Sequence, residues 1–141
     1  MLVDANILLY SVDSTSPFHP PAEAWLTDAL NGNRRVAIPW LSTSAFIRIA
    51  TNPRASAHPL TPAEAWEHVD GWLGAPAAWV PVPGRGYHQI FRDLVVALDL
   101  RGPLVADAAM AALCIEHGIE IISADSDFAR FTDLRWFNPV A

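Results

Sequence analysis

Four aspartates lie beside apolar segments of the sequence, where a carboxylate is expected to serve a site. Asp4 separates the apolar runs "MLV" and "ILLY", and Asp107 lies in the alanine-rich segment "VADAAMAAL". Asp125 and Asp127 belong to "SADSD", which follows the apolar run "IEII". Burial of an unpaired carboxylate is costly, so each group must be paired, bound to a metal or placed at the mouth of a cleft. A lone aspartate in a helix is usually solvated, but several in one domain favour a shared site.

These carboxylates predict a hard divalent cation. The five histidines show no zinc-type spacing, and they are expected on the surface; Cys114 is expected in the core. Mg²⁺ and Mn²⁺ prefer oxygen ligands and keep several waters. Such an ion activates water and neutralises charge that develops on a phosphate. The chemistry indicated is therefore phosphodiester hydrolysis.

The basic residues narrow the choice of function. The net charge is −6, and all nine basic residues are arginines, so the chain contains no lysine. This excludes Schiff-base chemistry, P-loop nucleotide binding and Ser–Lys dyads. It also argues against a broadly basic surface for nucleic acids. Any nucleic acid would have to be bound by a local arginine cluster. Arg48 and Arg54 are the candidates, and a role as ordinary surface charges is about equally expected for them.

The length and composition predict one globular domain over residues 1–141. The chain is 52% hydrophobic and 17% charged, which is typical of a folded domain rather than a disordered one. No apolar run approaches the roughly 20 residues of a membrane span. The N-terminal segment lacks the pattern of a signal peptide, so a cytoplasmic protein that does not contact membranes is expected.

Strands and helices alternate along the chain. Buried strands are expected over 1–4, 34–39, 78–82, 119–123 and 134–137. Helices are expected over 6–12, 22–30, 41–51, 62–73, 87–100 and 103–117, with a short helical turn over 126–131. Three boundaries have specific signals: Thr61 and Glu64 form a capping box, Gly118 ends a helix, and Pro81 places its strand near an edge.

This alternation predicts an α/β fold, a three-layer sandwich with a mostly parallel central sheet flanked by helices. Ligands of such sheets bind beyond the carboxyl ends of the strands. Asp4 ends the first strand and Asp125 follows the fourth. If these strands are neighbours, both carboxylates lie at the same edge.

Three segments together resemble the PIN-domain family and, within it, the VapC toxins of bacterial toxin–antitoxin pairs. They are "VDAN" at the start, "AFIRIATNPR" in the middle, and "LVADAAMAALCIEHGIEIISADSDFARF" near the end. The resemblance implies a PIN-like sandwich and a metal-dependent endoribonuclease that cuts tRNA or ribosomal RNA and leaves 5′-phosphate and 3′-hydroxyl ends. It also implies a homodimer and a cognate, VapB-like antitoxin.

The resemblance assigns roles to particular residues. Asp4, Asp107 and Asp125 match the catalytic acids of the family. Asn6, Ser123 and Asp127 match its auxiliary polar positions. Asp4 and Asp107 are expected to bind one Mg²⁺ or Mn²⁺ directly. Asp125 and Asp127 are expected to act through water or to hold a second, weaker ion.

One position departs from the family pattern. Most PIN nucleases carry a glutamate on the helix after the second strand, and here the aligned residue is Ala45. Neither Glu64, which belongs to the capping box, nor Glu67 on the same helix replaces it. A second hypothesis is therefore a PIN fold that has lost turnover and acts only as a binding module.

A third hypothesis is a phosphotransfer domain, because receivers and haloacid-dehalogenase-like phosphatases also place an aspartate after a strand. Receivers need a lysine, which this chain lacks. The phosphatases need a second aspartate where this chain has Asn6. Both features rank this hypothesis below the other two.

Overall fold

The computed structural model describes all 141 residues as an α/β sandwich with a five-stranded parallel sheet. The strand order is β3-β2-β1-β4-β5, and every neighbouring pair is parallel. The strands are β1 (Leu2–Val3), β2 (Val36–Ala37), β3 (Ala78–Trp79), β4 (Ile121–Ile122) and β5 (Trp136–Phe137). The helices are α1 (Ala5–Val12), α2 (His19–Leu30), α3 (Trp40–Ala50), α4 (Pro62–Leu73), α5 (Tyr87–Ala97), α6 (Pro103–His117) and the 3₁₀ helix η1 (Ser126–Arg130).

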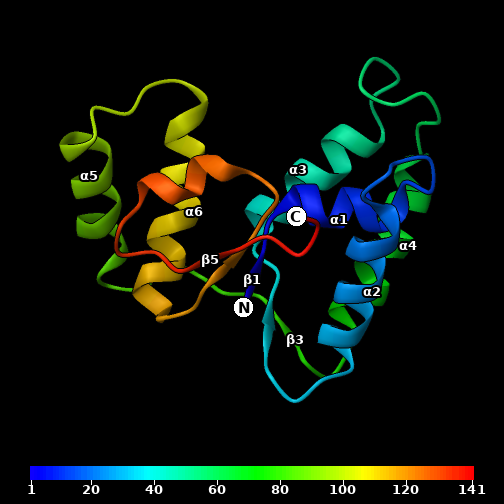
Figure 1. Ribbon diagram of the computed structural model, residues 1–141, viewed down its shortest axis with the longest axis horizontal. Coiled ribbons are helices and arrows are strands. Elements are labelled where there is room, and N and C mark those ends of the chain that lie inside the picture. Colours follow the sequence, from blue (N-terminus) through cyan, green and yellow to red (C-terminus); the bar gives the residue numbers. More distant parts are fainter.

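The helices form two layers, one on each side of the sheet. Helices α5 and α6 lie together on one side, and α1 to α4 lie on the other (Figure 1). Successive side chains of a strand point to opposite faces, so each short strand supplies both layers. Leu2 and Ile121 belong to the core beneath α6, whereas Val3 and Ile122 belong to the core beneath α1 to α4. The predicted fold class is confirmed.

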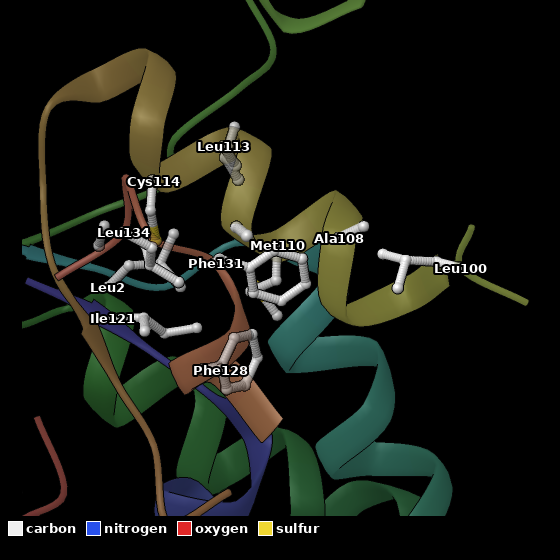
Figure 2. Close-up of a cluster of buried hydrophobic side chains, with 12 residues drawn as sticks. Leu2, Leu100, Ala108, Met110, Leu113, Cys114, Ile121, Phe128, Phe131 and Leu134 are labelled. Atoms are coloured by element: carbon white, nitrogen blue, oxygen red, sulfur yellow. The ribbon is translucent and has the colours of Figure 1, made fainter. Parts of the chain in front are cut away.

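The core beneath α6 also holds the segment that follows β4. Figure 2 shows Phe128 and Phe131 of this segment close to Leu2, Ile121 and side chains of α6. Phe128 and Phe131 are almost fully buried, at 1% and 2% exposed. Because Phe128 lies within η1, its burial fixes η1 at the carboxyl edge of the sheet.

Most predicted elements are present, and three differ in detail. The strands are shorter than expected, with two residues each in the ladder. Helix α2 begins at His19 rather than at residue 22, because Pro20 and Pro21 occupy its first turn, where proline is well tolerated. Helix α5 ends at Ala97 rather than at residue 100, so Leu98 lies beyond the helix and is 42% exposed.

The local signals at the other helix ends are confirmed. Thr61 and Glu64 form the capping box of α4, with each side chain accepting a hydrogen bond from the other residue's backbone N–H. Gly118 ends α6 in the left-handed conformation. The strand β3, which precedes Pro81, lies at an edge of the sheet. No helix has both the length and the apolar character needed to cross a membrane.

A buried hydroxyl joins α3 to the strand that precedes Asp4. Ser42 is fully buried, and its Oγ donates a hydrogen bond to the main-chain carbonyl of Val3 at 2.6 Å. The contact spans 39 residues of sequence and holds α3 against the end of β1. It therefore positions the helix that carries Ala45 relative to Asp4.

We expect Ser42→Ala to lower the free energy of unfolding by about 1 kcal/mol, because it removes a buried hydrogen bond. The matched control is Ser44→Ala, on the same helix but exposed, which should change stability by less than about 0.5 kcal/mol. Urea unfolding of both variants measures the difference. Equal stabilities would show that the Ser42 hydrogen bond contributes nothing to stability.

Candidate active site

Asp4 and Asp125 each follow a strand and cap the helical segment that comes next. Asp4 is the N-cap of α1 and accepts a hydrogen bond from the N–H of Ala5 at 2.8 Å. Asp125 is the N-cap of η1 and accepts one from the N–H of Asp127 at 2.8 Å. Strands β1 and β4 are neighbours, so the two carboxylates lie at the same edge of the sheet. An aspartate directly before a helix is the sequence signal for this capping role.

The hydroxyl of Ser123 connects these two segments. Its Oγ donates to Oδ2 of Asp4 at 2.7 Å, and it accepts from Nδ2 of Asn6 at 3.1 Å and from the N–H of Asp125 at 3.0 Å. A hydroxyl has one proton to donate and two lone pairs, so this set is complete. Asn6 extends the network by accepting from the N–H of Ala124 at 3.2 Å. Two of the three predicted auxiliary residues, Asn6 and Ser123, therefore lie together and hold Asp4 in place.

Asp4 is consequently the most restrained of the four aspartates. One oxygen accepts from Ala5, and the other accepts from Ser123 and, at 3.3 Å, from Asn6. Burial raises the pKa of Asp4, and the hydrogen bonds from Ser123 and Ala5 oppose part of that rise. Both oxygens thus accept hydrogen bonds from protein donors, which was not predicted from the sequence.

Helix α6 brings Asp107 to the same edge. Asp107, Asp125 and Asp127 each offer a carboxylate oxygen, and these atoms all lie within 4.8 Å of one another. We call these three residues the acid cluster. Burial, followed by the charges of Asp125, Asp4 and Asp127, raises the pKa of Asp107 to about 6. All four predicted aspartates therefore lie in one region, with Asp4 beside the cluster and close enough to affect Asp107.

An arginine that the sequence did not single out pairs with the acid cluster. Nε of Arg130 donates to the main-chain carbonyl of Asp127 at 2.9 Å, and Nη2 donates to its carboxylate at 3.1 Å. The only signal in the sequence is the spacing of three residues, which places both side chains on one turn of η1.

A cleft of about 320 Å³ lies between α3 and α6 at this edge. Asp4 and Asp107 line it together with Ala45 and Arg48 of α3. The remaining lining residues are Ala5, Leu41, Ser44, Ala106, Met110 and Phe128. Arg54, the other predicted RNA-binding residue, is exposed in the loop after α3 and does not line the cleft. A larger open groove along α2 contains none of the four aspartates.

The acid cluster fits a hard divalent cation. Its potential ligands are carboxylate oxygens alone, and Cys114 is buried in the core, as predicted. The ring of His19 instead forms a hydrogen bond with the carbonyl of Tyr10 and pairs with Glu23. Carboxylates brought this close repel one another, and after burial, the larger cause, this repulsion contributes to the raised pKa of Asp107. A cation would relieve that repulsion.

We expect the raised pKa of Asp107 to make the free energy of unfolding depend on pH when a chelator is present. Asp107 has a pKa of about 6 in the folded chain against an ordinary value of 3.8, so the folded state binds its proton more tightly. Its ionisation therefore lowers the free energy of unfolding as the pH rises from about 4 to about 6. Asp107→Asn should raise stability at pH 7.5 by about 1 kcal/mol, a value reduced for solvent screening, and leave it unchanged at pH 4.

Thermal unfolding at the two pH values measures this effect. Asp70→Asn serves as the control, because Asp70 is exposed on α4 and lies outside the acid cluster. An Asp107→Asn gain of equal size at pH 4 and pH 7.5 would show that the charge of Asp107 is not its source.

Comparison with known proteins places the chain in a family. The PIN domain family model matches residues 1–134. Ribonuclease VapC37 of Mycobacterium tuberculosis (strain ATCC 25618 / H37Rv) is 41% identical over 140 residues, which are 99% of this chain and 97% of the relative. Ribonuclease VapC33 of the same strain is 38% identical over 140 residues, 99% of this chain and 98% of that protein.

Solved structures share the fold at low sequence identity. VapBC2 from Rickettsia felis, bound to a DNA fragment from its promoter, matches with a TM-score of 0.72 at 13% identity, covering 97% of this chain and 96% of that one. The Mycobacterium tuberculosis toxin VapC20, which cleaves the sarcin–ricin loop, matches with a TM-score of 0.68 at 15% identity, covering 95% and 98%. The family-model match over residues 1–134 and the curated relatives at 41% and 38% identity show that the chain belongs to the PIN domain family, among the VapC ribonucleases.

Proposed function

We propose that the chain is the toxin of a toxin–antitoxin pair and acts as a divalent-metal-dependent endoribonuclease on tRNA or ribosomal RNA in the cytoplasm. The observation that supports this most strongly is the convergence of carboxylate oxygens of Asp107, Asp125 and Asp127 within 4.8 Å of one another, with Asp107 and Asp4 lining the adjacent cleft. The curated relatives are named ribonucleases, and they match nearly the whole chain. Mg²⁺ or Mn²⁺ is the cation that carboxylate oxygens favour.

The residues of the cleft have distinct tasks in this proposal. Asp4 and Asp107 would hold the ion directly, and Asp125 and Asp127 would act on it through water, while Ser123 and Asn6 fix the carboxylate of Asp4. When bound, the ion supplies an activated water and neutralises negative charge on the phosphate. Arg48 has no ion pair and lies across the cleft on α3, so its guanidinium is available for an RNA phosphate.

Sequencing the 5′ ends of cellular RNA after brief expression tests this function. We expect discrete new 5′-phosphate ends in tRNA or ribosomal RNA. Asp107→Asn should reduce them by about 100-fold or more, because it removes a charged ligand of the ion. Arg48→Ala should weaken cleavage more than Arg54→Ala, since Arg54 lies outside the cleft lining. An unchanged RNA profile for the natural chain would count against a nuclease.

Ala45 supports a second candidate function, a PIN-fold binding module without turnover. Its methyl group lines the cleft with Asp4 and Asp107, at the position where most family members carry a glutamate. A missing carboxylate weakens cation binding, although waters can complete the coordination of Mg²⁺. The two candidates therefore differ in whether the remaining acids are enough for catalysis.

We expect Ala45→Glu to lower the Mn²⁺ concentration needed for half-maximal cleavage and for half-maximal thermal stabilisation, because it adds a carboxylate to the cleft wall. Ala45→Gln is the matched control, since it adds the same bulk without charge, and it should leave both concentrations unchanged. Cleavage by Ala45→Glu together with none by the natural chain would favour the binding module. Equal effects of Glu and Gln would show that the added charge does not reach the ion.

The proposal extends to two protein partners. A VapB-like antitoxin is expected to place a basic side chain in the acidic cleft, which would oppose the charge of the acid cluster. A homodimer is supported by large apolar side chains that remain exposed on helices, among them Trp40 at 53%, Leu41 at 45% and Trp66 at 43%. Exposed apolar groups of this size favour an interface.

We expect light scattering at micromolar concentration to give twice the 15.4 kDa mass of one chain, because a second copy covers apolar side chains of α3. Trp40→Ser should shift the mass towards that of the monomer. His88→Ser, an exposed substitution on α5, is the control and should leave the mass unchanged. A stable natural monomer at this concentration would contradict the dimer.

A further inference from the structure

Arg130 is the only arginine that forms an ion pair with the acid cluster. The other paired arginines contact Glu120, Asp93 and Asp99, away from the cleft. Arg130 binds Asp127 twice, through Nε to the main-chain carbonyl at 2.9 Å and through Nη2 to the carboxylate at 3.1 Å. The side chain is only 34% exposed, compared with 81% for Arg101 in its surface pair. The Arg130 pair is thus the less exposed of the two.

The backbone around this pair is fixed from several directions. Phe128 and Phe131, on either side of Arg130 in sequence, are buried in the core beneath α6 (Figure 2). Asp125 caps the same turn through the N–H of Asp127. The backbone of Asp127 and Arg130 is therefore held beside Asp107 and Asp125.

The charges at this edge set how many cations it can hold. Asp4, Asp107, Asp125 and Asp127 carry up to four negative charges, and Arg130 offsets one of them. One divalent cation then leaves a single excess negative charge. A second ion at Asp127 would lie close to the guanidinium, and two cations at one carboxylate repel each other.

We propose that Arg130 takes the place of a second metal ion at Asp127, so that the acid cluster binds one divalent cation rather than two. This rests on the proposed function only in that a divalent cation binds the cluster. Arg130 is a positioning residue here, because it acts on the ion through Asp127. The weak lowering of the pKa of Asp107 by the charge of Arg130 is consistent with its position.

The test is a count of bound Mn²⁺ by equilibrium dialysis combined with electron paramagnetic resonance, on the full chain without RNA. We expect one ion per natural chain, and a second, weaker ion in Arg130→Gln. Arg130→Lys keeps the positive charge and should bind one ion. The control Arg101→Gln removes an exposed arginine that pairs with Asp99, and it should also bind one.

A double variant identifies where the added ion binds. Arg130→Gln combined with Asp127→Asn should lose the second ion, because it lacks the carboxylate that Arg130 had occupied. Asp127→Asn alone should keep one ion. If Arg130→Gln fails to fold, the ion count of Asp127→Asn is the measurement that tests the proposal. Partial unfolding cannot imitate the expected result, since it would remove an ion rather than add one.

The proposal would be overturned if the natural chain bound two Mn²⁺ ions or none. It would also be overturned if folded Arg130→Gln bound the same number of ions as the natural chain, or if folded Asp127→Asn lost its ion. These counts are independent of the RNA experiment. A chain that binds one Mn²⁺, gains a second in Arg130→Gln and cuts no RNA would support Arg130 and defeat the nuclease. A natural chain that cuts RNA with two ions bound would support the nuclease and defeat the proposal for Arg130.

Discussion

The hydrogen bonds of the Ser123 hydroxyl are the interaction on which the rest of the site depends. This buried group joins the carboxylate of Asp4 to the backbone of Asp125, across two strands whose residues are far apart in sequence. Its proton goes to Asp4 because its other two partners are donors. Both ends of the connection are N-caps, so the same contact aligns the starts of α1 and η1.

The carboxylates of the site differ in how many hydrogen bonds they accept from the protein. Asp4 has both oxygens engaged by protein donors, whereas no protein donor bonds Asp107, whose pKa is raised to about 6 by burial and by its acidic neighbours. Asp127 is held by Arg130. The four aspartates are therefore not equivalent, and Asp107 is the one whose charge is least compensated by the protein.

Much of this arrangement could be predicted from the sequence because it follows from local patterns. The alternation of strands and helices predicts a mostly parallel sheet, and an aspartate after the first and fourth strands predicts a shared edge if these strands are neighbours. The structure supplies that condition, because β1 pairs with β4. The aligned position of Ala45 also lies in the cleft, as its helix was expected to place it. The ends of α2 and α5 were less predictable, because tertiary packing and prolines in the first turn decide them.

The hydrogen-bond partners could not be predicted in the same way. The hydrogen bonding of the Asp4 carboxylate depends on Ser123, which is 119 residues away in the sequence. The pair formed by Arg130 depends on how η1 packs through Phe128, and a spacing of three residues alone does not indicate an ion pair. Residue types at strand ends thus predict where a site lies, whereas the distribution of charge within it requires the folded chain.

The two-residue strands make the register of the sheet decisive for activity. Leu2 and Val3 point into different cores, as do Ile121 and Ile122 on the neighbouring strand. A slip of one residue between β1 and β4 would exchange these faces, and it would also carry Asp4 away from Ser123. Packing of the two cores and assembly of the acidic edge therefore depend on the same register between β1 and β4.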